Sequence, residues 1–130
     1  MAEPSLHGKL SVAISANDVE RSLDFYVKGL GFTEVERMQK NGTLQGAMIA
    51  AGDAYLGISQ DDFSKGHDRK KGIGLSLHIE TDQDLKALAE HTRQAGIALE
   101  KEPGPLPWGP IGFSLKDPDG LTVYLSNPQR

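Results

Sequence analysis

The stretch "LSVAISANDVERSLDFYVKGLGFTEVERMQ", residues 10–39, predicts a strand, a helix and a second strand. Over residues 10–15, apolar side chains alternate with small ones, which is the two-residue period of a strand. Asn17 or Asp18 then supplies a helix cap, and apolar residues follow at intervals of three and four. Gly31 ends this pattern, so a short helix is expected between two strands.

Two further strands follow this unit. The dipeptide Asn41-Gly42 is a strong signal for a two-residue hairpin turn, so a third strand is expected over 43–50. A turn then leads to "YLGISQ", 55–60, as a fourth strand. The first half of the chain thus has the order strand, helix, strand, strand, strand.

The second half begins with the same pattern. "IGLSLHIETDQDLKALAEHTRQAGIALEKE", 73–102, predicts a strand over 73–79, a helix capped by Thr81 and a strand over 97–102. In the strand, Leu75 and Leu77 are expected to face the helices. The intervening side chains then face the other way.

The rest of the second half completes the repeat. "GPLPWGP", 104–110, is predicted to be a loop, and strands are expected over 111–116 and 121–126 on either side of the turn "DPDG". The last strands of the two halves align residue by residue. In that internal alignment Gly57 takes the place of Tyr124.

The repeat predicts one domain, residues 1–130, built from two βαβββ modules. Module one covers about residues 8–60 and module two about 73–127. Residues 61–72, "DDFSKGHDRKKG", form a charged, glycine-containing connector between them, which we interpret as a solvated loop.

The composition limits the function classes. The 130 residues carry a net charge of −4 with no basic face, which is unlike a nucleic-acid binder. The absence of cysteine excludes disulfides, thiolate metal ligands and a cysteine nucleophile. No signal peptide and no membrane-spanning apolar run is evident, so we expect a cytoplasmic protein without nucleic-acid or membrane partners.

Two motifs at this separation resemble the vicinal oxygen chelate superfamily, which contains glyoxalase I, bleomycin-resistance proteins and extradiol dioxygenases. They are "NDVERSLDFYVKGLGF", 17–32, and "WGPIGFSLKDPDGLTVYL", 108–125. The resemblance implies an α+β fold in which two βαβββ modules form curved mixed sheets around a cleft, with the helices outside. It also implies a small-molecule ligand in the cleft and a homodimer.

In the metalloenzymes of this superfamily, His, Gln or Glu ligands for a metal lie on the first and last strand of each module. We align these four positions with Ser11, Gly57, Gly74 and Tyr124. None of these side chains is a good ligand for zinc or iron, which require imidazole or carboxylate groups there. We therefore predict no metal and no other cofactor.

His78 and Tyr124 are the side chains in the predicted cleft that are best suited to chemistry. His78 suits a general base, although a half-buried structural histidine explains it as well. Tyr124 either fills space or anchors a ligand. If the "DPDG" hairpin is in simple register, Phe113 lies opposite Tyr124 and the two form an aromatic wall.

Other cleft positions are small or lie in loops. Gly57 and Gly74, as strand glycines, either widen the cleft or let the sheet curve. Trp108 closes one end of the cleft or stacks on the ligand. The complete set of predicted ligand-binding residues is Ser11, Tyr55, Gly57, Ser59, Gly74, Ser76, His78, Trp108, Phe113 and Tyr124.

These features favour a metal-independent small-molecule-binding protein similar to the bleomycin-resistance branch, which would sequester an antibiotic or an aromatic metabolite. One alternative is a metal-free lyase, isomerase or hydrolase that uses His78 or Tyr124. A metal-dependent glyoxalase or dioxygenase is a further alternative. Whether the protein is an enzyme stays open at this point.

Overall fold

Two sheets of four strands make up the fold, and the computed structural model describes residues 4–128 of the chain. Sheet A contains β1 (Ser11–Ala16), β2 (Thr33–Lys40), β3 (Thr43–Ala51) and β4 (Ala54–Gln60). Sheet B contains β5 (Ser76–Glu80), β6 (Lys101–Pro105), β7 (Ile111–Lys116) and β8 (Thr122–Ser126). The helices are α1 (Val19–Leu23), its π-helical continuation η1 (Asp24–Gly29), and α2 (Leu85–Gln94).

The two sheets have the same topology. The strand order is β1-β4-β3-β2 in sheet A and β5-β8-β7-β6 in sheet B. In each sheet the first strand runs parallel to the last, and the other pairs are antiparallel. The predicted α+β fold with two βαβββ modules is therefore confirmed.

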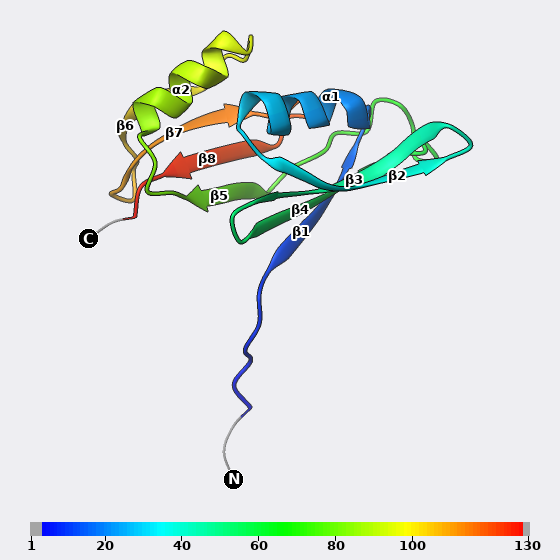
Figure 1. Cartoon of the computed structure of the whole chain (residues 1–130), viewed down its shortest axis with the longest axis horizontal. Helices are drawn as coiled ribbons and strands as arrows, with labels where there is room; N and C mark the ends of the chain where they lie inside the picture. The colour runs from blue at the N-terminus through cyan, green and yellow to red at the C-terminus, as the bar shows by residue number, and fades with distance from the viewer. Residues whose placement is uncertain (1–3, 129–130) are drawn as a thin grey trace.

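Both helices lie on the same side of the sheets, and the N-terminal segment projects from the other side (Figure 1). Helix α1 packs on sheet A and α2 on sheet B. The apolar faces of strands and helices meet in one core on the side of the sheets that carries the helices. The largest buried side chains in it include Tyr26, Ile49, Ile58, Phe113 and Leu115.

The local signals in module one are largely confirmed. Asp18 is the N-cap of α1, and its carboxylate accepts a hydrogen bond from Arg21 N. Asn41 and Gly42 both have positive φ, 54° and 77°, as the predicted two-residue hairpin turn requires.

Module two differs from the prediction at the start of its first strand. β5 begins at Ser76 rather than at residue 73, because Gly72 and Gly74 have φ values of 72° and 76°. Leu75 N donates to Gly72 O, so these residues form a turn and leave the strand. Leu75 is 48% exposed and does not face the helices as expected, whereas Leu77 packs against the core.

The helix and the next strand of module two also begin later than predicted. Asp84, not Thr81, caps α2, and its side chain accepts hydrogen bonds from Lys86 N and Ala87 N. The strand predicted over 97–102 is instead β6, which extends into the predicted loop. Ile97 N donates to Thr92 O at the end of α2, so it does not pair in the sheet.

The two modules are joined by polar contacts as well as by the core. His91 Nε2 donates to Lys28 O at 2.8 Å, and Thr92 Oγ1 donates to Gly29 O at 3.0 Å. Two side chains of α2 thus donate to backbone carbonyls at the end of η1, where a helix has no partners of its own.

Within residues 4–128, no helix is both long enough and apolar enough to cross a membrane.

Candidate functional site

The side of the sheets opposite the helices, called here the open face, carries small side chains on sheet A. On β1, Ser11, Ala13 and Ser15 are exposed, because they alternate with residues that face the core. Their partners across the parallel pairing with β4 are Tyr55, Gly57 and Ser59. Four of the ten predicted ligand-binding residues are therefore adjacent: Ser11, Tyr55, Gly57 and Ser59.

The open face of sheet B carries three rings, which we call the aromatic cluster: His78, Trp108 and Tyr124. His78 and Tyr124 are partners across the parallel pair β5–β8, and their rings stack with centroids 4.7 Å apart and planes 20° apart. The Trp108 ring meets Tyr124 edge-on at 5.1 Å and His78 at 5.4 Å. These geometries are typical of favourable aromatic contacts.

The aromatic cluster is accessible. His78 is exposed, Tyr124 is half-buried and Trp108 is 50% exposed. Ser76, also a predicted site residue, has its Oγ 2.8 Å from His78 Nε2. The cluster therefore offers ring faces and edges together with a hydroxyl and an imidazole at one place on the surface.

A tight loop holds Trp108 in position. Leu106 N donates to Pro110 O, and Gly109 N donates to Leu106 O, so the loop turns back on itself. Leu106 is 3% exposed and covers Gly112, where a Cβ would lie 2.7 Å from Leu106 Cδ1. The loop thus packs against part of sheet B, and a glycine is needed beneath it.

The "DPDG" turn before β8 is fixed by Asp117, which is 5% exposed. Its Oδ1 accepts hydrogen bonds from Asp119 N and Leu121 N, and its Oδ2 accepts one from the Tyr26 hydroxyl at 2.9 Å. Burial, and next the negative charge of Asp117, hold the pKa of Tyr26 far above its usual value. The strand that carries Tyr124 therefore begins at a turn held by three hydrogen bonds to Asp117.

The connector between the modules is closed by an ion pair. Asp61 Oδ2 lies 2.8 Å from Lys71 Nζ and 3.3 Å from an Arg69 nitrogen. The hydrogen bond from Lys71, followed by that from Phe63 N, lowers the pKa of Asp61. Lys71 Nζ also donates to Asn17 Oδ1, so the connector is anchored to module one.

A groove of about 370 Å³ is lined mainly by residues of β1, β4 and β5, and it includes both core-facing side chains and side chains of the open face. Its walls are mainly apolar, with Tyr55, Ser76 and His78 as the polar side chains. Ligand pockets of this size and character are common. The groove is lined by Leu10, Val12, Phe32, Ala54, Tyr55, Leu56, Leu75, Ser76, Leu77, His78 and Ile79.

Two predicted site residues lie elsewhere. Phe113 pairs with Leu125, while Ser114 is the partner of Tyr124, so Phe113 faces the core and is 0% exposed. The expected register was one residue out, and such a shift moves a side chain to the other face of a sheet. Gly74 lies in the turn before β5 rather than inside a strand.

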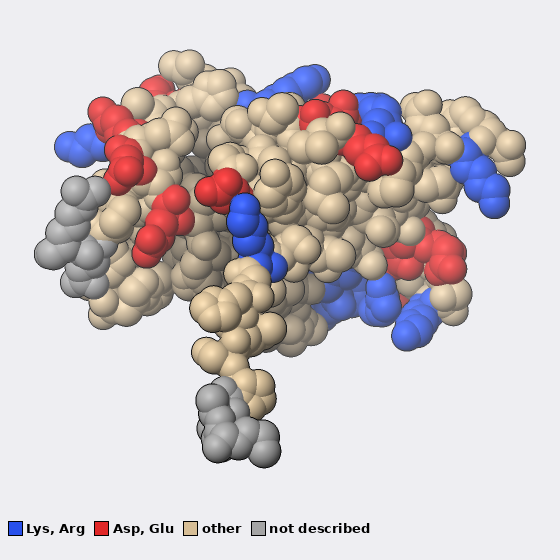
Figure 2. Space-filling view, turned by 60° about the horizontal axis from the view of Figure 1, so that its bottom comes forward, with Lys and Arg blue, Asp and Glu red and all other residues tan. Residues whose placement is uncertain are grey.

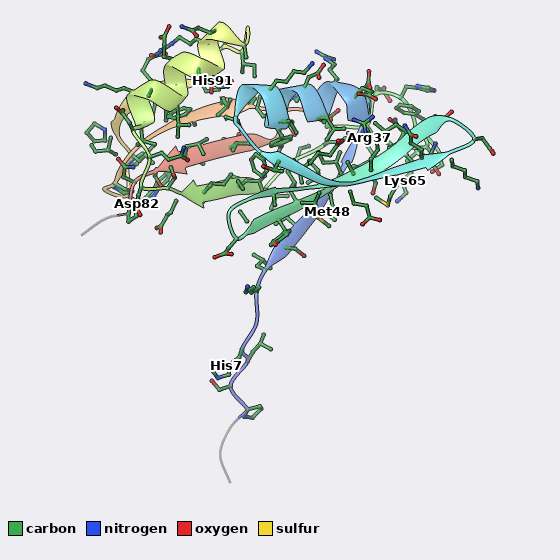
Figure 3. All side chains as sticks on the ribbon, viewed as in Figure 1. His7, Arg37, Met48, Lys65, Asp82 and His91 are labelled. Atoms are coloured by element: carbon green, nitrogen blue, oxygen red, sulfur yellow. The ribbon has the colours of Figure 1, made fainter. Side chains whose placement is uncertain are left out.

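Some residues of the open face were missed. Met48 points away from the helices (Figure 3), since it alternates with the buried Ala47 and Ile49. Its methyl carbon would lie 3.5 Å from a Cβ on Gly57, so it fills part of the space beside that glycine. The alternation along β3 could have revealed Met48, whereas no pattern pointed to Leu106.

The open face does not fit the metal site of the superfamily. The sequence alignment assigned the four ligand positions to Ser11, Gly57, Gly74 and Tyr124, whereas the strand register pairs Gly57 with Ala13 and Tyr124 with His78. In the two pairs that the register brings together, His78 is the single strong metal ligand. Within residues 4–128, no three His, Cys, Asp or Glu side chains come together in a way that could hold a metal ion.

Comparisons with known proteins agree with this architecture. A domain from Frankia sp. EAN1pec, described as a glyoxylase/bleomycin resistance protein/dioxygenase domain, has a TM-score of 0.75 at 23% identity, over 97% of this chain and 95% of that one. TnmS3 from Streptomyces sp. CB03234, an antibiotic binding protein, has a TM-score of 0.74 at 22% identity, over 98% and 100%. TioX from Micromonospora sp. ML1 has a TM-score of 0.73 at 19% identity, over 92% and 98%.

At these identities the structural matches establish the fold alone. A comparison with curated protein sequences finds no match. Residues 10–125, however, match the family model described as the Glyoxalase/Bleomycin resistance protein/Dioxygenase superfamily. This match spans nearly the whole chain, both sheets and both helices, and the chain therefore belongs to that superfamily.

Proposed function

We propose that the chain is a metal-independent small-molecule-binding protein that sequesters an aromatic antibiotic or metabolite. The observation that carries the proposal is the aromatic cluster of His78, Trp108 and Tyr124, which is accessible beside an apolar groove. Flat conjugated molecules gain most from such rings, because stacking adds to the burial of apolar area.

The small-sided half of the open face supports the same proposal. The small side chains of Ser11, Ala13 and Ser15 leave room above β1, and Gly57 leaves room beside Ala13. Met48 is flexible enough to adapt to a ligand. The similarity to TnmS3, an antibiotic binding protein, supports an antibiotic as the ligand class. The poor fit of the donor set to zinc or iron supports binding without a metal.

We further propose that the modules act as one domain and that the protein is a cytoplasmic homodimer. Leu6, Leu10, Tyr55 and Ile73 are exposed, and a second copy would remove part of this apolar surface from water. The cysteine-free sequence is compatible with a reducing compartment.

A binding screen tests the proposal. Isothermal titration calorimetry with a panel of planar aromatic compounds is expected to find stoichiometric binding to the metal-free protein. Trp108 is the single tryptophan of the chain, so its fluorescence should change on binding. Stoichiometric zinc, nickel, manganese or iron in protein purified without chelator would overturn the metal-independent assignment.

A second candidate function is a metal-free hydrolase or lyase, favoured by the 2.8 Å contact between Ser76 Oγ and His78 Nε2. A histidine beside a hydroxyl can serve as its general base. Turnover of an ester or lactone substrate that disappears in both Ser76→Ala and His78→Ala, with folding intact, would support this function. Binding without turnover would exclude it for the compounds tested.

A further inference from the structure

The tip of the β2–β3 hairpin carries a chemically reactive pair of residues that the proposed function does not use. Asn41 and Gly42 form the two-residue turn, and asparagine is one of the thermolabile residue types. Figure 1 shows this hairpin reaching beyond the rest of the fold, and in Figure 2 the same end of the molecule is a narrow lobe with a basic side chain near its tip. Both residues of the turn are exposed, so water reaches them.

The groups that can react in this turn are free. Within residues 4–128, no hydrogen bond engages the Asn41 side chain or the Gly42 N–H. Gly42 has no Cβ, and one built there would meet nothing within 4 Å, so nothing crowds its backbone nitrogen. That nitrogen can therefore approach the side-chain amide of Asn41 whenever the turn opens.

The tip opens at little cost, because β2 buries little. All 8 residues of β2 are exposed, and β2 is an edge strand that pairs with β3. Arg37 also binds Glu20 of α1 at 3.2 Å. The methyl group of Met38 lies beside Gly46 on β3. Segments with few buried contacts open locally at low free energy, so we expect frequent opening at this turn.

The other two asparagines of the chain are protected by their surroundings. Asn17 Oδ1 accepts a 2.7 Å hydrogen bond from Lys71 Nζ, which holds its side chain in place. Asn127 Nδ2 donates to a backbone carbonyl at 2.7 Å. The residue after Asn127 is Pro128, whose nitrogen carries no hydrogen and cannot attack the side chain. Attack by the following backbone nitrogen is therefore expected first at Asn41.

We propose that Asn41 is a site of spontaneous deamidation, and that its isoaspartyl product detaches β2 from β3 at the turn. In the first step the Gly42 nitrogen forms a bond to Cγ of Asn41, and the Cγ–Nδ2 bond breaks. Ammonia leaves with the proton of the Gly42 N–H. Water then opens the resulting cyclic imide at one of its two carbonyls, which gives aspartate or isoaspartate. Water is the single co-reactant, because no electrons are exchanged.

The isoaspartyl product does not fit the hairpin. It adds one methylene group to the main chain, because the chain then runs through the former side chain of residue 41. The number of atoms in the loop fixes the turn type and the register, so the pairing of Lys40 with Thr43 should be lost first. Because every residue of β2 is exposed, the core should stay intact while β2 loosens.

Storage of the intact protein in warm, mildly alkaline buffer tests the proposal. Peptide mapping by mass spectrometry follows the conversion of each asparagine, and labelling with an isoaspartyl methyltransferase identifies isoaspartate. Asn41 is expected to convert about tenfold faster than Asn17, whose hydrogen bond from a charged group must break first. Asn127 should stay unchanged. Hydrogen exchange over residues 33–40 should rise in step with the isoaspartyl fraction.

Two variants separate the steps. Asn41→Gly keeps a Gly-Gly turn, which suits the same hairpin, but it lacks the reactive amide. Its hydrogen exchange over residues 33–40 should stay constant during storage. Asn41→Asp supplies the charge of the product without the longer main chain, so before storage its exchange should match that of the fresh parent protein.

The outcomes are distinguishable. The same storage of the chain unfolded in urea shows that the conditions suffice for the reaction. If Asn41 then stays unchanged in the folded protein, or converts later than Asn17, the proposed site is wrong. Isoaspartate at residue 41 with unchanged exchange over residues 33–40 would overturn the proposed detachment of β2. No ligand enters the experiment, so the proposed function stands or fails separately.

Discussion

The hydroxyl of Tyr26, on the helix of module one, donates a buried 2.9 Å hydrogen bond to Asp117 at the start of the last hairpin of module two. The two residues are 91 positions apart in the chain. The contact links the core of one module to the turn from which Tyr124 is positioned in the other.

Replacement Tyr26→Phe should therefore destabilise the protein, because one carboxylate oxygen of Asp117 loses its donor in the core. We expect a loss of about 1.5–3 kcal/mol in the free energy of unfolding, the usual range for a hydrogen bond to a charged group. Urea denaturation measures it. Tyr55→Phe, at an exposed tyrosine, is the matched control and should change stability by less than about 0.5 kcal/mol.

The same contact predicts a loss of stability in alkali. The pKa of Tyr26 is raised in the folded state, so this group contributes its full stability below pH 10, its unfolded value. Above pH 10 the unfolded chain releases the Tyr26 proton and the folded chain keeps it, so stability should fall by about 1.4 kcal/mol per pH unit. The contribution of Tyr26 is the slope of stability against pH in the parent protein minus the same slope in Tyr26→Phe. Identical slopes would refute the prediction.

Substitution by alanine should change the stability differently at two strand glycines on the open face. A Cβ at Gly112 would lie 2.5 Å from Leu125 O and 2.7 Å from Leu106 Cδ1, so Gly112→Ala is expected to cost about 1–3 kcal/mol. A Cβ at Gly57 would meet Met48 at 3.5 Å, an ordinary contact, so Gly57→Ala should stay within about 1 kcal/mol of the parent. Thermal unfolding of the pair provides the comparison, and equal effects would contradict it.

Loss of the ion pair between Asp61 and Lys71 should loosen the connector. Asp61→Asn is expected to speed cleavage by trypsin after Arg69 and Lys70, because the loop is no longer closed on itself. Asp68→Asn, an equal change of charge in the same loop, serves as the control.

Acid should act on the same ion pair. The folded-state pKa of Asp61 is lowered, so its contribution is present above the unfolded value of 3.8 and is lost as the pH falls below it. The cleavage rates of the parent and of Asp61→Asn should therefore converge only well below pH 3.8, measured with an acid-stable protease. A constant difference down to pH 2 would contradict this account.

The aromatic cluster should dominate the affinity for neutral aromatic probes. Tyr124→Ala is expected to weaken the binding of 2-(2-naphthyl)ethanol by about tenfold, since it removes a ring that stacks on His78. Phe63→Ala is a matched control, because Phe63 also stacks on a histidine, His67, in the connector. Equal affinities of the two variants would exclude the cluster as the binding surface.

Most of the fold could be predicted because residues that are close together in the sequence determine the elements of the repeat. The alternation along β1, the Asp18 cap and the Asn41-Gly42 turn each depend on neighbouring residues, and each is found in the structure. Errors arose where a distant contact decides the conformation. Ile97, for example, bonds to the end of α2 instead of joining a strand.

The candidate site was predictable in its chemistry but not in its register. His78, Trp108 and Tyr124 were all anticipated, yet the partner of Tyr124 is Ser114, one residue away from the expected Phe113. A sequence pattern gives the faces of each strand separately, whereas the pairing of two strands depends on the turn that joins them. The groove along β1, β4 and β5 was not predicted, because it exists only where residues from separate segments of the chain meet.

The bonds from His91 and Thr92 to the carbonyls of Lys28 and Gly29 make each module depend on the other. A single βαβββ unit would leave those carbonyls to solvent and one side of the shared core uncovered. Because the two units complete each other in one chain, their open faces can differ: one is small-sided, and the other carries the aromatic rings.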